Sequence, residues 1–130
     1  MGRLVHRRSA AALVVALILV IGSVAGCSRS STKTVPDSLV GVWTTPDPRY
    51  ADRFLDLGRG SVTFGQGHGA QSVYAVSSVE WITDHGQSLF TIHYETEDGT
   101  DASLSFYHVP LDGTLVFRNQ PQIHWFRKRS

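Results

Sequence analysis

Beyond about residue 36, hydrophobic and polar residues alternate along the chain in short runs that turn-forming residues separate. Strict alternation places every second side chain on one face, which is the pattern of a half-buried β-strand. In one run, for example, Phe90, Ile92 and Tyr94 share a face. The pattern predicts about eight short strands, over residues 39–44, 50–57, 61–64, 71–82, 88–96, 102–108, 115–118 and 122–128.

Tight turns join these predicted strands in sequence order. Asp98-Gly99 and Asp112-Gly113 are dipeptides that accept the positive φ of a type I′ hairpin turn. The run 71–82 is either one bent strand or two, with the break at Ser77-Ser78. The glycine-rich segment 65–69 is expected to be a hairpin loop, because no helix or phosphate-binding lysine follows it. We therefore predict an all-β fold, an antiparallel meander that forms a small barrel or a curled sheet, since closure removes exposed edges.

The first 26 residues follow a different pattern. Arg3, Arg7 and Arg8 give a positively charged start, and Ala10–Ile21 is an unbroken run of aliphatic residues and alanines. A membrane-spanning helix needs about 18 to 20 apolar residues, so this run is short for a permanent anchor and typical of a secretory signal. A twin-arginine signal is poorly matched, because no large apolar residue follows the arginine pair at once.

Cys27 is the only cysteine of the chain and directly follows Val24-Ala25-Gly26. These four residues resemble the lipobox of bacterial lipoproteins, in which a branched residue and two small residues precede the modified cysteine. The resemblance implies cleavage between Gly26 and Cys27, and a diacylglycerol on the Cys27 thiol with fatty acyl chains such as palmitate. Two acyl chains suffice for stable membrane attachment. A plain signal peptide and an uncleaved N-terminal helix are the alternatives.

These features divide the chain into a lipoprotein signal peptide (1–26), a flexible tether (27–35) and a single domain (36–130). The tether is expected because residues 28–34 are small and polar. Without the signal peptide the chain keeps nine Lys and Arg against 11 Asp and Glu, a net charge of about −2. Nucleic-acid-binding domains usually carry a basic surface, so no nucleic-acid partner is expected. The expected location is a bacterial cell envelope, anchored in the cell membrane or in an outer membrane.

The start of the domain resembles another family. Residues 36–43 end in Gly41-Val42-Trp43, and this segment resembles the lipocalin pattern of a short helical turn followed by Gly-x-Trp on the first strand. In that superfamily an arginine of the last strand packs over the tryptophan, and the resemblance implies this role for Arg127. Such a contact contributes about 0.5 to 2 kcal/mol. Residues 47–55 are similar to small uncharacterised lipocalin-like domains, and this resemblance implies no activity.

Residues that could carry chemistry are scattered. The histidines of the domain lack the neighbouring spacing of a zinc site and are expected at the surface or rim of the barrel; they are His68, His85, His93, His108 and His124. The chain contains no EF-hand loop and no Gly-x-Ser-x-Gly elbow, and an acylated Cys27 could not act as a nucleophile. We therefore expect no enzymatic activity, no metal and no cofactor.

The expected function is a non-catalytic binding module for a small apolar ligand or an envelope protein. A structural or assembly accessory of the envelope is the alternative, and an envelope hydrolase is the least supported. The sequence does not identify ligand-binding residues. An open apolar pocket with a few polar groups would favour a ligand, whereas a filled barrel would argue against one.

Overall fold

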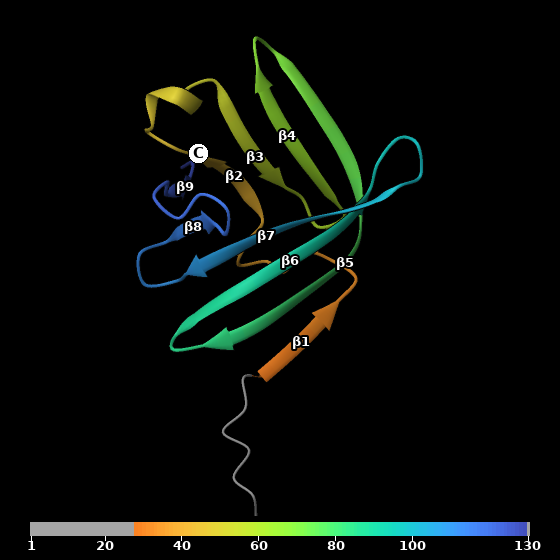
Figure 1. The fold of residues 1–130 in the computed structure, drawn as a ribbon, viewed down its shortest axis with the longest axis vertical. Helices are drawn as coiled ribbons and strands as arrows, with labels where there is room; N and C mark the ends of the chain where they lie inside the picture. Colours follow the sequence, from red (N-terminus) through yellow and green to blue (C-terminus); the bar gives the residue numbers. More distant parts are fainter. Residues whose placement is uncertain (1–27, 130) are drawn as a thin grey trace, which may run out of the picture.

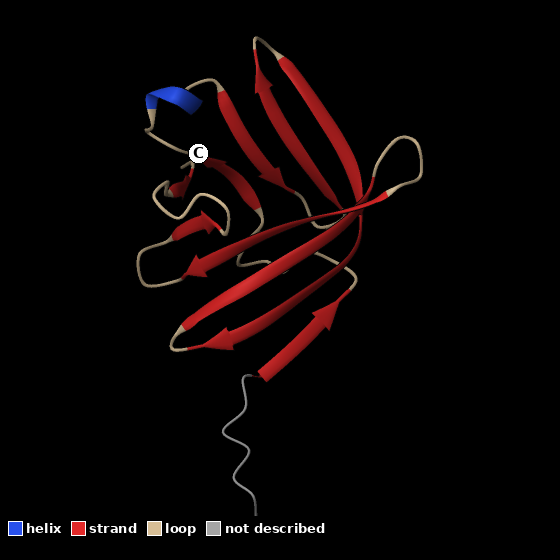
Figure 2. Ribbon diagram, in the orientation of Figure 1, coloured by secondary structure: helices blue, strands red, loops and turns tan. Residues whose placement is uncertain are grey.

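The computed structural model describes residues 28–129 and contains nine strands and one short 3₁₀ helix (Figures 1 and 2). The signal peptide and lipobox predicted over residues 1–27, with Cys27 itself, lie outside the described residues. The elements are β1 (Ser28–Thr32), β2 (Gly41–Thr44), η1 (Pro48–Tyr50), β3 (Arg53–Leu57), β4 (Ser61–Gly67), β5 (Ala70–Asp84), β6 (Gln87–Glu95), β7 (Asp101–Val109), β8 (Thr114–Phe117) and β9 (Trp125–Arg127).

The strands form one antiparallel sheet that closes into an eight-stranded barrel, with β1 as an additional strand. Strands β2 to β9 follow each other as a meander, and the last strand returns to pair with β2 through Trp43 and Arg127. Pairing of β5 with both β4 and β6 completes the ring. The predicted all-β meander is therefore confirmed, and the fold is consistent with a small lipocalin-like barrel.

The eight predicted strands correspond to β2 to β9, with different ends at some of them. The run 50–57 becomes a strand only at Arg53, because Asp47 caps a 3₁₀ helix that Pro48 begins. The first run becomes a strand only at Gly41, because the amide of Leu39 closes a turn on the carbonyl of Pro36 at 2.9 Å. The turn glycines Gly99 and Gly113 adopt φ of 79° and 64°, but Asp98 and Asp112 lack the positive φ that a type I′ turn also requires, so the type I′ turns expected at these two dipeptides do not form.

Strand β5 is one long bent strand rather than two. Its register against β6 shifts between Val76 and Ser78, so Ser77 is the extra residue of a β-bulge. A bulge bends a strand and increases its twist. The first part of β5 pairs with β4, and the part after the bulge pairs along Val79–Thr83 with β1. Strand β1 thus extends the sheet beyond the place where β4 ends.

The prediction of a flexible tether over residues 27–35 is wrong for the residues that the structure describes. Ser28–Thr32 form β1, with Ser28 opposite Thr83 and Thr32 opposite Val79. Val35 is only 2% exposed and belongs to the core, so the ordered domain begins before residue 36. Polar residues form this strand because its backbone groups find partners on the free edge of β5, which requires no apolar side chain.

The core fills the barrel from every strand of the meander. Inward residues follow the two-residue period of each strand, so that Leu55 faces Trp43 and Phe64 across the pairs on either side. The buried hydrophobic residues are Val35, Leu39, Trp43, Leu55, Leu57, Val62, Val79, Phe90, Ile92, Phe106, Leu115, Ile123 and Trp125.

The contact implied by the lipocalin resemblance is present. The Cζ of Arg127 lies 4.9 Å from the ring centroid of Trp43, and the Arg127 guanidinium also donates to the carbonyl of Ser38. Gly41 makes room for this arrangement, because a Cβ there would lie 3.3 Å from the Arg127 Cδ, and its φ of +142° also favours glycine. The last strand is thereby fixed to the segment that opens the barrel.

Candidate functional site

A pocket of about 220 Å³ opens at one end of the barrel. Its residues come from the start of β3, the end of β4, the end of β8 and the start of β9, which meet at the same end of an antiparallel barrel, and from η1 beside them (Figure 1). We call this end the mouth. The pocket is lined by Tyr50, Arg53, Phe54, Leu55, Phe64, Gly65, Gln66, Phe117, Gln120 and Trp125.

Five of the ten lining residues of the pocket are aromatic. Trp125 contacts Phe117 edge-on with ring centroids 5.4 Å apart, and it contacts Tyr50 at 6.1 Å. Phe64 continues the wall into the barrel, 5.7 Å from Tyr94 and 6.1 Å from Tyr74. Aromatic contacts of this kind contribute about 0.5 to 1.5 kcal/mol each beyond area burial. The wall is therefore apolar and held by its own contacts.

The short helix η1 positions Tyr50 over the mouth. The Asp47 carboxylate accepts from the backbone amide of Arg49 at 2.9 Å and forms an ion pair with the Arg49 side chain at 2.8 Å. These contacts lower the pKa of Asp47 and raise the pKa of Arg49. The Tyr50 hydroxyl accepts a hydrogen bond from Gln120 Nε2 at 2.8 Å, across 70 residues of sequence. The backbone of Tyr50 is thus positioned by η1, and its hydroxyl by the hydrogen bond from Gln120.

The Phe54 ring occupies space that a side chain at residue 65 on the neighbouring strand would fill, and residue 65 is a glycine. Gly65 pairs with Phe54 across β3 and β4, and a Cβ at residue 65 would overlap the Phe54 ring. The ring lies against the glycine and forms part of the pocket wall. Gly65 therefore has a packing role, in addition to lying at the register shift of β4 between Gly65 and Gly67.

Five of the lining residues carry a polar side-chain group, and most of these groups are bonded within the protein or covered. Trp125 is 5% exposed, and its Nε1 has no hydrogen-bond partner within residues 28–129. Leaving a buried N–H without a partner costs about 1 to 3 kcal/mol. The Arg53 guanidinium lies 5.7 Å from the Tyr50 ring, and Gln66 Nε2 donates to Ser72 Oγ at 2.9 Å. The pocket thus combines an aromatic wall with one cation, and the unpartnered Trp125 N–H is covered by the surrounding atoms.

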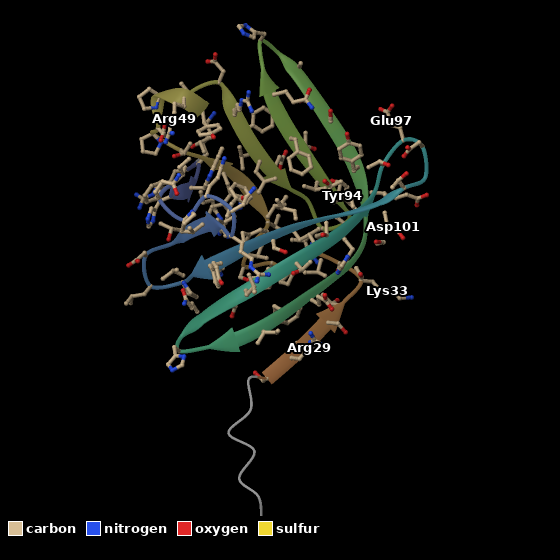
Figure 3. All side chains as sticks on the ribbon, viewed as in Figure 1. Arg29, Lys33, Arg49, Tyr94, Glu97 and Asp101 are labelled. Carbon is tan, nitrogen blue, oxygen red and sulfur yellow. The ribbon has the colours of Figure 1, made fainter. Side chains whose placement is uncertain are left out.

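Tyr94 and Tyr74 extend the aromatic cluster behind Phe64 (Figure 3 labels Tyr94). Their rings stack with centroids 5.2 Å apart. Burial, and secondarily the charge of Tyr74, raises the pKa of Tyr94. Tyr94 therefore stays neutral at physiological pH and can donate a hydrogen bond, but it does not act as a base there.

Beyond the mouth the barrel is filled. His108 is only 8% exposed and contacts the rings of Trp43 and Phe90 edge-on, each with centroids 6.2 Å away. Burial, and secondarily the charge of Arg127, lowers the pKa of His108. The expectation that all histidines lie at the surface or rim is therefore wrong for His108, because the inward period of β7 continues through Phe106 to this residue.

The other candidate residues do not converge. His93 lies on the outer face of β6, with Nε2 3.2 Å from the Glu80 carboxylate. Of the segment 65–69, predicted to be a hairpin loop, only residues 68–69 form the β4–β5 turn, because residues 65–67 belong to β4. Within the described part of the chain, no three His, Cys, Asp or Glu side chains come close enough together to hold a metal ion. None of the described helices is long and apolar enough to cross a membrane.

Of the predicted site residues, Gly26 and Cys27 lie outside the described residues, and the ligand-binding residues were left open by the sequence. Alternation does place Phe64, Phe117 and Trp125 on inward faces. Alternation does not reveal that the Trp125 indole N–H lacks a hydrogen-bond partner, because the atoms around this N–H come from side chains on distant strands. Comparison with protein-family models, with curated proteins and with solved structures found no match for this chain.

Proposed function

We propose that this protein is a lipid-anchored component of a bacterial cell envelope whose barrel binds one small, mainly apolar ligand at its mouth. The observation that carries the binding role is the open pocket of about 220 Å³, whose lining combines five aromatic side chains with the Arg53 guanidinium. Aromatic rings provide apolar contact area for a ligand, and the guanidinium provides hydrogen-bond donors for an acceptor group on it. The anchor is supported by the sequence Val24-Ala25-Gly26-Cys27.

The size of the pocket limits the ligand. Drug-sized ligands occupy pockets of about 300 to 1,000 Å³, whereas an engineered cavity of about 150 Å³ already takes up benzene. A pocket of about 220 Å³ therefore suits a single ring or a short branched chain. Because Leu55, Ile92 and Phe106 fill the barrel beneath, a long ligand could not enter it. This distinguishes the proposed ligand from a full fatty acid.

The lining of the pocket favours binding over catalysis. Nucleophilic and acid–base mechanisms use Ser, Cys, His or carboxylate side chains within reach of the substrate. None of these residue types is among the described residues that line the pocket. We therefore propose a non-catalytic role.

The binding role can be tested by NMR titration of the ¹⁵N-labelled protein with acetophenone, which joins one ring to one carbonyl acceptor. We expect the indole N–H signal of Trp125 to shift as the ligand packs against the ring, and Trp125→Leu to weaken binding by about tenfold because the wall loses an aromatic ring. The control is Phe126→Leu, since Phe126 is 44% exposed on the opposite face of β9. Absence of any shift at Trp125, or equal weakening by both variants, contradicts the proposal.

The anchor is tested separately, by mass spectrometry of the protein extracted from native membranes. We expect a chain that begins at Cys27 and carries a diacylglycerol. An unmodified Cys27, or a chain that begins elsewhere, contradicts this part of the proposal without affecting the pocket.

A further inference from the structure

We propose that the ligand of the mouth is a small carboxylate, with its apolar body against the aromatic wall and its charged group at Arg53. This inference rests on the proposed binding function and specifies its ligand class. The first observation is the charge of the lining: Arg53 is its one charged residue, and none of the described lining residues is acidic. With residues 1–26 removed the chain carries a net charge of about −2, so this cationic lining is a local feature.

The second observation is the contrast between two arginines on the same ring. Arg49 and Arg53 place their Cζ atoms 5.9 and 5.7 Å from the centroid of Tyr50. Arg49 is neutralised by Asp47, with Nη2 2.8 Å from the carboxylate oxygen, and it does not line the pocket. Arg53 lines the pocket and has no ion pair within residues 28–129. Its charge is therefore available to a ligand.

The third observation is that the charged group of the pocket is a hydrogen-bond donor. Arg53 offers several N–H groups in a planar fork and accepts no hydrogen bond. An ionised carboxylate is an acceptor-only group with two oxygens, and it pairs with arginine through two parallel hydrogen bonds. A neutral alcohol or amine would bring donors of its own to these groups. A carboxylate is thus the complement of what the pocket presents.

The test compares benzoate with benzamide, which has the same ring and a similar shape but no charge. Binding of each to the purified full-length protein is followed through the Trp125 indole signal. We expect benzoate to bind about tenfold more tightly than benzamide, which corresponds to replacing a neutral hydrogen bond with a charge-assisted one. Added salt should reduce this preference, because the Arg53 side chain is exposed to solvent.

Two matched variants test whether Arg53 supplies the positive charge that favours benzoate. In Arg53→Gln we expect the two probes to bind equally, whereas Arg49→Gln should keep the preference for benzoate. Both residues are exposed, so both variants should fold, and their thermal unfolding provides the check. An equal effect of the two variants, or wild-type protein that binds benzamide as tightly as benzoate, overturns the inference. If acetophenone binds but benzoate binds no more tightly than benzamide, the carboxylate inference is wrong and the proposed binding function stands. If none of the three probes binds, the proposed function is wrong as well.

A different observation supports a second inference, about orientation: we infer that the mouth faces away from the membrane. It rests on the proposed acylation of Cys27, the residue directly before β1. Ser28 pairs with Thr83 near the β5–β6 turn, whereas the pocket residue Gly65 pairs with Gln71 near the other end of β5. Residues 71 and 83 are separated by up to about 40 Å along an extended strand.

The figures show the same separation. Arg29 on β1 lies at the lower end of the barrel and Arg49 on η1 at the upper end (Figure 3). Because β1 is paired with β5 rather than forming a free tether, acyl chains on Cys27 would hold the β5–β6 turn at the bilayer surface. The ligand would then enter from the aqueous side.

Orientation can be measured in vesicles that contain the acylated full-length protein and lipids with nitroxide-labelled head groups. A fluorophore is attached to Gln87→Cys at the β5–β6 turn or, as the control, to Gln71→Cys at the opposite end of β5; both positions are exposed. We expect strong quenching at residue 87 and little at residue 71. Equal quenching, or the reverse order, overturns the inference.

Discussion

Arg127 and Trp43 face each other across the pair of strands that closes the barrel, with the arginine Cζ 4.9 Å from the indole centroid. The indole Nε1 donates to the carbonyl of Leu39 at 2.9 Å, and the guanidinium donates to the carbonyl of Ser38. One stacked pair therefore connects β9, β2 and the turn before β2. Because β9 has only three residues, side-chain contacts supply much of what fixes it.

Replacing Arg127 with alanine should destabilise the protein. The variant loses a cation–π contact and a charged hydrogen bond, which together correspond to about 1 to 3 kcal/mol of unfolding free energy. Urea unfolding measures the change. The control is Arg129→Ala, the same substitution at an exposed residue two positions further along. Equal stability of the two variants would show that the stacked pair does not secure the barrel.

The fold was largely predictable because the barrel obeys a period of two. Phe90, Ile92 and Tyr94 alternate inward as expected, and the Asp-Gly turns lie where the meander needs them. Strand β1 was not predictable, since Ser28–Thr32 contains no apolar residue and forms through backbone pairing alone. The mouth was not predictable either, because its features depend on contacts such as Gln120 with Tyr50, which no local pattern encodes.

A substitution at Val35 tests whether the segment before β2 is part of the core. Val35 is 2% exposed, so Val35→Ala should leave a cavity and lower the unfolding free energy by about 1 to 3 kcal/mol. Val73 is 57% exposed on β5, so Val73→Ala is a matched control that should change stability little. Chemical denaturation compares the two. If Val35→Ala behaves like Val73→Ala, the segment is a tether after all.

Phe54 and Gly65 should be energetically coupled. Gly65→Ala places a methyl group where the Phe54 ring lies, and such overpacking costs about 1 to 3 kcal/mol. In the Phe54→Ala background the same substitution should cost much less, because the ring is gone. A double-mutant cycle of unfolding free energies measures the coupling, for which we expect about 1 kcal/mol or more. Additive effects would contradict the proposed packing.

His108 should make stability depend on pH. Burial lowers the pKa of His108 in the folded protein, so in acid the unfolded chain binds the proton more readily. The stability contribution is therefore complete above the pKa of an unburied histidine, about 6.5, and is lost as the pH falls from there towards the lowered pKa of the folded state. Urea unfolding at pH 8 and pH 5 should reveal the loss.

The control variants separate His108 from the exposed histidines. His108→Gln should remove a large part of the difference between pH 8 and pH 5, whereas His124→Gln, at an exposed position, should keep it. An unchanged pH dependence in His108→Gln would assign the effect to other groups.

The central claim, that the mouth receives a small ligand, is tested most directly by a crystal structure of the protein grown with acetophenone. We predict the ring between Phe117, Phe64 and Tyr50, with the carbonyl oxygen turned towards the Arg53 guanidinium. A mouth closed by its own side chains, or acetophenone bound only elsewhere on the protein, would contradict the claim.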